Sequence, residues 1–301
     1  MPTQPQKHHA DYAQKRRRGL KITKRLIILV WLLLFVLLGL GAWAVVRQIT
    51  AIDQSNQHLE QSQTEVFRPN VLLVLEDDVD NMSRYVFTLL CFNTQDGKIS
   101  ATVLPENMDT LVGQKQATLQ QQFVYGGPQQ ARLAVQTAFS ITVDRYFCCS
   151  FSTLESLLDE LGAVEFTVPE DLYYQNEDGT VLCDLTAGEQ SLNSQQVLQF
   201  LRYPGWSSET QASEQRGALA GALINQAATT AVQQQMTALY EQIVNSAQTD
   251  VSLVDLNQLA GQYSAFTGSA PASVVTITGS ATDEVFIPDD TAKAAVLAQF
   301  K

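Results

Sequence analysis

The side chains that most often act as nucleophiles or metal ligands are few in this sequence and poorly spaced for either role. All three histidines precede residue 60: His8, His9 and His58. The cysteines show no C-x-x-C spacing and have no histidine beside them: Cys91, Cys148, Cys149 and Cys183. Zinc sites need such ligands at such spacings, so none is predicted. Three of the cysteines lie in apolar runs and are expected to be buried hydrophobic residues, with a disulfide in an oxidising exterior as the alternative.

Charged residues are the remaining candidates for chemistry. Glu76, Asp77 and Asp78 close an apolar run that begins at Asn70, a place where acids often simply begin a solvated loop. Arg202 comes late in a predicted helix, where a guanidinium group can complement the carbonyl end. The role of these residues therefore depends on the elements that bring them together.

The charge balance restricts the possible ligands. The chain has 19 basic and 31 acidic residues, and its first 25 residues hold eight of the bases but only one acid. The rest therefore carries 11 bases against 30 acids, a formal charge of −19. Binding to nucleic acid relies on Lys and Arg neutralising phosphates, so no nucleic-acid partner is expected. Any cation that serves an anionic ligand must come from a short list.

The N-terminal region predicts a single membrane anchor. Residues 26–46 run 21 positions without a charge, about 31 Å of helix, which matches a hydrocarbon core of about 30 Å. The basic residues 1–25 place the N-terminus in the cytoplasm, so residues 68–301 lie outside the cell membrane, above a polar stalk at 47–67. A cleavable signal peptide is the alternative, but its apolar region usually spans only about 7–15 residues.

Strand and helix patterns alternate along the outer domain. Short apolar runs predict strands at 70–75, 85–93, 98–104, 145–151, 164–168 and 274–278, with an Asp96-Gly97 turn between the second and third. Helical periodicity appears at 128–139 after a Gly126-Gly127 turn, and at 152–161 with Ser152 as the expected N-cap. Further helices are expected at 194–201 and 215–244, and an exposed insertion at 173–184. This alternation predicts an α/β fold with a sheet covered on both faces.

Seven segments in order resemble the LytR-CpsA-Psr (LCP) family of bacterial envelope proteins. They are Asn70–Asp77 (NVLLVLED), Phe123–Gly127 (FVYGG), Ile141–Tyr146 (ITVDRY), Leu157–Glu165 (LLDELGAVE), Leu185–Asn193 (LTAGEQSLN), Val197–Tyr203 (VLQFLRY) and Val285–Asp290 (VFIPDD). The resemblance spans nearly all of 68–301. It implies a mixed central β-sheet flanked by helices, with a groove for a polyprenyl-pyrophosphate lipid. Members of the family transfer a glycopolymer from that lipid to peptidoglycan or protein, with carboxylates holding Mg²⁺ and arginines holding the pyrophosphate.

The resemblance also assigns candidate site residues. Asp77 matches the family's first metal-binding aspartate and is the candidate Mg²⁺ ligand and catalytic residue. Arg202 matches the first arginine of an Arg-x-Arg motif and is the second catalytic candidate. Arg84, Arg202 and Arg216 are the candidate pyrophosphate-binding residues, because guanidinium groups stabilise phosphate oxygens.

Several signature charges of the family are replaced. Its second metal aspartate becomes Tyr85, its Pro-Arg-Asp motif becomes Pro105-Glu106-Asn107, and the second arginine of Arg-x-Arg becomes Pro204. Arg84 stands one position late, which on a strand would turn it to the opposite face unless a bulge intervenes. An Arg-to-Glu change at a pyrophosphate site removes an attractive charge and adds a repulsive one. Each of these two changes weakens the binding of pyrophosphate by about 4 kcal/mol at an effective dielectric near 20.

Two functional hypotheses follow. The first is a membrane-anchored, Mg²⁺-dependent phosphotransferase or pyrophosphatase that moves lipid-linked glycopolymers to peptidoglycan. The second is a non-catalytic relative that binds lipid or cell-wall components or regulates an active paralogue. Convergence of Asp77, Arg84 and Arg202 on one apolar-walled groove would favour the first. A sensor signalling through the basic tail is a third possibility, but that tail is too short to fold as a DNA-binding domain.

Overall fold

The computed structural model describes residues 68–77, 84–228, 247–252, 254–255, 263–266, 270–282 and 284–301. The tail, membrane span and stalk expected within residues 1–67 lie outside this part of the chain. Of the helices that are described, none is both long enough and apolar enough to cross a membrane.

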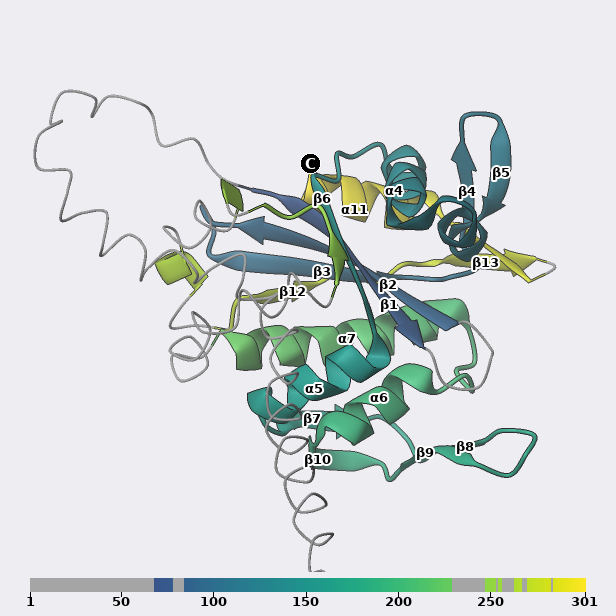
Figure 1. Cartoon of the computed structure of the whole chain (residues 1–301), viewed down its shortest axis with the longest axis vertical. Coiled ribbons are helices and arrows are strands. Elements are labelled where there is room, and N and C mark those ends of the chain that lie inside the picture. Colours follow the sequence, from purple (N-terminus) through teal and green to yellow (C-terminus); the bar gives the residue numbers. More distant parts are fainter. Residues whose placement is uncertain are drawn as a thin grey trace, which may run out of the picture.

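A six-stranded sheet forms the centre of the domain, in the order β11-β6-β1-β2-β3-β12 (Figure 1). Strands β1, β2 and β3 form an antiparallel meander, whereas β1 pairs with β6, and β3 with β12, in parallel. The sheet is therefore mixed, as predicted. Its strands are β1 (Asn70–Asp77), β2 (Arg84–Asn93), β3 (Lys98–Leu104), β6 (Arg145–Ser150), β11 (Gln248–Thr249) and β12 (Ala272–Val274).

Helices cover both faces of this sheet (Figure 1). One layer contains α5 (Phe151–Leu161), α6 (Ser194–Arg202) and α7 (Glu209–Ala227), with the paired strands β7 (Val164–Val168) and β10 (Gly188–Leu192), and the hairpin β8 (Leu172–Gln175) and β9 (Val181–Leu185). The other contains α4 (Leu119–Phe139) and α11 (Asp290–Phe300), with the hairpins β4 (Asp109–Val112) and β5 (Lys115–Thr118), and β13 (Gly279–Thr282) and β14 (Val285–Pro288). A short 3₁₀ helix spans Tyr263–Phe266.

Strand β1 shows why both faces must be covered. Its alternate residues Val71, Leu73 and Leu75 belong to the core beneath α5, α6 and α7. Leu72 and Val74 belong to the core beneath α4 and α11. Successive side chains of a strand point to opposite faces, so this continuous apolar run supplies two separate cores.

Helix α5 begins two residues earlier than the sequence pattern suggested. The N-cap is Ser150, whose Oγ accepts a hydrogen bond from the Thr153 backbone N–H at 3.1 Å. The expected cap, Ser152, is wrong: it lies inside the helix, exposed, with its hydroxyl 2.7 Å from that of Ser150. Phe151 is buried in the core, so packing extends the helix past the position that the capping pattern favoured. Gly162 ends the helix, as expected.

Ser150→Ala is expected to lower the free energy of unfolding by about 1 kcal/mol, because it removes the acceptor for an otherwise unpaired helix N–H group. Ser152→Ala, the matched control two residues away, is expected to change it by less than half of that. Urea titrations of the two variants beside the wild type make the comparison. A larger loss for Ser152→Ala would return the cap to that residue.

Other boundaries differ from the sequence predictions for recognisable reasons. Helix α4 starts at Leu119 rather than 128, but its backbone leaves helical geometry at Gly126 and Gly127, where a turn was predicted. The predicted helix at 215–244 starts earlier, at Glu209, and its part beyond 228 lies outside the described residues. The late strand ends at Val274 instead of beginning there. The expected insertion at 173–184 folds as the β8–β9 hairpin.

The four cysteines, all in the described part of the chain, are buried, and none of them forms a disulfide. Burial raises the pKa of Cys148 to about 12 and that of Cys183 to about 11. Thiols of this kind stay protonated and unreactive at neutral pH. The expectation that the cysteines act as buried hydrophobic residues is confirmed.

Candidate functional site

A polar cavity of about 570 Å³ lies where β1 ends and β2 begins. All four residues singled out from the sequence line it: Asp77, Arg84, Arg202 and Arg216. They come from four different elements, namely the end of β1, the start of β2, the last turn of α6 and the first half of α7. The fold thus brings together side chains separated by up to 139 positions in the chain.

Asp77 and Arg202 form a closed ion pair in the wall of this cavity. The Arg202 Nε donates to Asp77 Oδ2 at 2.8 Å and its Nη2 donates to Oδ1 at 2.9 Å. The side chains are only 5% exposed for Asp77 and 16% for Arg202, and the guanidinium carbon lies 5.1 Å from the centre of the Phe151 ring. A bidentate ion pair of this kind fixes the orientation of both side chains, so Asp77 holds Arg202 in place.

Arg84 lies on the same side of the sheet as Asp77. The two residues are directly paired across β1 and β2 in a regular register, and paired residues of an antiparallel ladder share a face. The expectation that Arg84 would face the opposite side without a bulge is therefore wrong. Its Nη1 donates to the Arg202 carbonyl at 3.0 Å and its Nη2 to the Tyr174 hydroxyl at 3.3 Å.

Arg216, on α7, lines the cavity. Its Nη2 donates to the Tyr203 carbonyl at 3.2 Å, while its buried Nε has no hydrogen-bond partner among the described residues. Burial lowers the pKa of this guanidinium, and the nearby carboxylates Glu106 and Glu209 only partly oppose that shift. Arg216 thus keeps unused donors that a ligand could engage.

Two acidic residues in the cavity were not selected from the sequence. Glu106 follows β3, and its Oε2 accepts the backbone N–H of Tyr85 at 3.0 Å. Burial raises the pKa of Glu106, against the lowering effects of that hydrogen bond and of Arg216. Glu209 occupies the first turn of α7. The position of Glu106 in the altered Pro-Arg-Asp motif was the signal that could have identified it.

Glu106→Gln is expected to raise the free energy of unfolding at about pH 7, because a carboxyl whose pKa is raised by folding destabilises the native state once it is ionised. The folded state binds the proton more tightly than the unfolded state, so this difference should shrink as the pH falls and vanish below about pH 4, where both states are protonated. The amide oxygen of Gln can still accept the Tyr85 N–H.

Denaturant titrations of wild type and Glu106→Gln at several pH values measure this effect. Glu165→Gln, at an exposed position of β7, is the matched control and should give no pH-dependent difference. A difference that stays constant from about pH 7 to pH 4 would contradict the assignment, since it could not arise from the titration of Glu106.

The described residues do not form a Mg²⁺ site by themselves. No three of their His, Cys, Asp or Glu side chains come together as possible metal ligands, and both carboxylate oxygens of Asp77 are engaged by Arg202. Mg²⁺ prefers six oxygen ligands, several of them waters or substrate oxygens. Asp78 lies outside the described residues. The Mg²⁺ expectation is thus not supported by this part of the chain, and no chemical step is derived through a metal.

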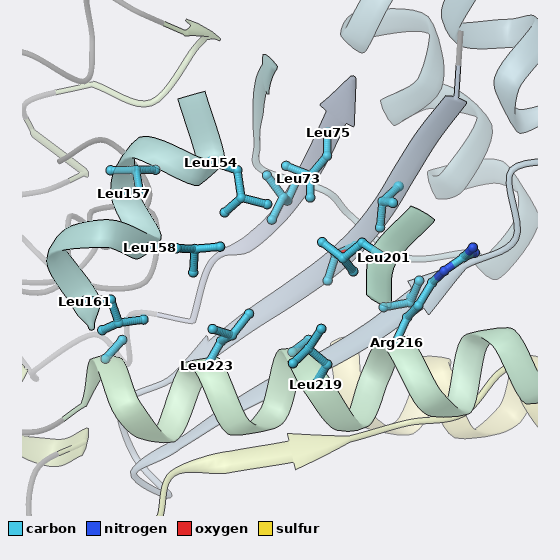
Figure 2. Close-up of a pocket in the computed structure, with 15 residues that line it drawn as sticks. Leu73, Leu75, Leu154, Leu157, Leu158, Leu161, Leu201, Arg216, Leu219 and Leu223 are labelled. Carbon is cyan, nitrogen blue, oxygen red and sulfur yellow. The ribbon is translucent and has the colours of Figure 1, made fainter. Parts of the chain in front are cut away.

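An apolar cavity of about 40 Å³ adjoins the polar one (Figure 2). Leucines from β1, α5, α6 and α7 line it, and Arg216 stands at one end with its guanidinium directed away from them (Figure 2). Val86, Leu201 and Arg216 line both cavities. A charged chamber therefore meets a narrow apolar one at Arg216, an arrangement suited to a ligand with an anionic head and an apolar tail.

These features define an α/β domain with an arginine-lined cavity at one end of a mixed sheet. A family model described as the LytR_cpsA_psr family matches residues 70–299, and the chain belongs to this LytR-CpsA-Psr family. The polyisoprenyl-teichoic acid–peptidoglycan teichoic acid transferase TagV of Bacillus subtilis (strain 168) is 22% identical over 290 residues, which cover 86% of this chain and 72% of TagV.

Solved structures share the fold. A putative transcription regulator from Eubacterium siraeum DSM 15702 superposes with a TM-score of 0.68 at 18% identity, over 80% of this chain and 96% of that one. The crystal structure of B. subtilis TagV gives 0.62 at 17% identity, over 77% and 95%. TagT bound to LI-WTA gives 0.60 at 16% identity, over 80% and 92%.

Proposed function

We propose that this protein binds a polyprenyl-pyrophosphate-linked glycopolymer in the charged cavity and hands the polymer to peptidoglycan. The observation that carries the proposal is the meeting of the two cavities at Arg216, beside Arg84 and Arg202. The pyrophosphate would contact the free donors of Arg84 and Arg216, and the first isoprene units would enter between the leucines. Family membership and the likeness to TagV support the same substrate class.

In the proposed transfer, an acceptor hydroxyl forms a bond to the polymer-side phosphorus. The bond from that phosphorus to the lipid phosphate breaks, and the hydroxyl proton is released. Guanidinium groups aimed at the phosphate oxygens stabilise the charge that develops on them. Arg84 and Arg216, which form no ion pair with the described residues, have donors available for this role, while Arg202 is paired with Asp77 and supports the wall of the cavity.

We further propose that the protein is anchored in the cell membrane by residues 26–46, with the N-terminus cytoplasmic and residues 68–301 outside. The uncharged 21-residue run and the basic residues that precede it support this topology. Protease added to intact cells should remove the outer domain and leave the basic tail. Digestion of the tail with protection of the domain would show that the protein has the opposite orientation in the membrane.

The test of function uses the full-length protein in lipid nanodiscs with a polyprenyl-pyrophosphate analogue. Binding and release of polyprenyl phosphate are measured separately, each with and without Mg²⁺. The proposal expects saturable binding that exceeds the binding of the matching polyprenyl alcohol, followed by release when an acceptor is supplied. Binding no tighter than that of the alcohol would refute it, and the Mg²⁺ arm decides the expectation drawn from the resemblance.

A non-catalytic binding protein is the second candidate, favoured by the closed pair between Asp77 and Arg202. That pair occupies the carboxylate expected to hold a metal and neutralises one of the three arginines. Binding of the analogue without any release of polyprenyl phosphate, in the presence of Mg²⁺ and acceptor, would support this candidate over the transferase.

A further inference from the structure

Four charged side chains face the cavity without pairing with one another. The ion pairs among the described residues are Asp77–Arg202, Arg132–Asp250 and Arg145–Asp255, and they include neither Arg84 nor Arg216, neither Glu106 nor Glu209. Each of these two arginines is therefore more than 4.0 Å from each of the two glutamates. The two arginines donate to carbonyl or hydroxyl oxygens and Glu106 accepts a backbone N–H, which leaves most of their hydrogen-bonding capacity unused.

Burial makes two of these separated charges, those of Arg216 and Glu106, unfavourable in the absence of a ligand. It lowers the pKa of Arg216 and raises that of Glu106, so each group is pushed towards its neutral form. The cost of a buried charge falls when the charge is both paired and hydrogen-bonded. A ligand that carries an anionic and a cationic group would pair the arginines and the glutamates at the same time.

The charge count of the cavity points in the same direction. Three arginines line it against four acids, Asp77, Glu106, Glu209 and the exposed Glu284, a formal charge of −1. A bare pyrophosphate would bring further negative charge into a net negative chamber, at an effective dielectric well below that of water. A protonated amino group beside the phosphate would offset that charge and contact a carboxylate.

We propose that the ligand of this cavity is an amino-sugar phosphate, with its phosphate on Arg84 and Arg216 and its ammonium group on Glu106 and Glu209. The inference rests on the proposed function and specifies the sugar at the phosphate end of the glycopolymer. A volume of about 570 Å³ lies within the range of small-molecule sites, so a sugar phosphate fits beside the lipid chain. Glu106 is then a specificity-determining residue that selects for the amino group.

The test compares glucosamine 1-phosphate with glucose 1-phosphate, two probes that differ at C2 in an ammonium or a hydroxyl group. Calorimetry on the full-length protein in nanodiscs at about pH 7 is expected to show about tenfold tighter binding of the amino sugar, as for a partly buried ion pair. Glu106→Gln should abolish most of that preference while tightening the binding of glucose 1-phosphate. Glu165→Gln, outside the cavity, should preserve the preference.

Each result decides the matter. Equal affinities in the wild type would overturn the inference, and that measurement needs no variant. Tighter binding of glucose 1-phosphate at lower pH, with no gain from the amino group, would mean that Glu106 binds phosphate in its protonated form and would also overturn it. If the lipid analogue binds but neither sugar phosphate does, the inference fails and the proposed function stands. If none of the three binds, both fail.

Discussion

Asp77→Ala is expected to lower the free energy of unfolding by about 3 kcal/mol or more, because it leaves the Arg202 guanidinium without its partner in a site where both side chains are largely buried. Truncating both residues should be less damaging than the sum of the single changes, since the double variant contains no unpaired charge. Denaturant titration of the two single variants and of the double variant measures this coupling.

The same residue separates a structural ion pair from a metal ligand. Asp77→Asn keeps an oxygen acceptor for Arg202 but removes the negative charge, so the lipid analogue should bind more tightly without Mg²⁺ because one more cation faces the cavity. A metal ligand would behave in the opposite way, since its loss weakens any Mg²⁺-dependent binding. Asp255→Ala breaks a similar two-pronged pair with Arg145 outside the cavity and should leave lipid binding unchanged.

Local patterns were sufficient for the central strands. The apolar run at β1 predicted a buried strand, and Asp96-Gly97 predicted the turn between β2 and β3. Gly97 has φ +62°, and a Cβ at this position would lie 2.4 Å from the Ala265 carbonyl oxygen. Glycine suits such a turn, so the Asp96-Gly97 pair was enough to predict the turn from the local sequence.

Elements set by tertiary packing were less predictable. The first half of α4 contains Phe123, whose ring centre lies 5.0 Å from that of Tyr85 on β2. This aromatic contact joins segments far apart in sequence, so the local pattern of residues 119–127 could not predict it. The start of α5 moved for the same reason, because Phe151 is buried in the core below the sheet. Tertiary burial overrode local capping preference at this position.

The sequence predicted which residues line the site, but it did not predict which of them form an ion pair. The positions of Asp77, Arg202 and Arg216 followed from the resemblance, and all three line one cavity. The ion pair between Asp77 and Arg202 joins residues 125 positions apart, and no spacing rule reaches that far. Arg84 was misjudged because its face was counted along one strand, whereas its pairing with Asp77 across the ladder determines it. Glu106 was undervalued because its burial, which raises its pKa, is a property of the folded structure and not of the local sequence.

Arg216→Gln is expected to weaken binding of the polyprenyl-pyrophosphate analogue by about 30- to 100-fold, the effect of losing charge-assisted hydrogen bonds to a phosphate. The free energy of unfolding should stay constant or rise, because burial disfavours this cation and it forms no ion pair with the described residues. Calorimetry and denaturant titration of the same protein sample give both values. Lys293→Gln, an equal charge change at an exposed position of α11, should affect neither. A variant that lost stability while retaining its affinity would show that Arg216 supports the fold rather than the ligand.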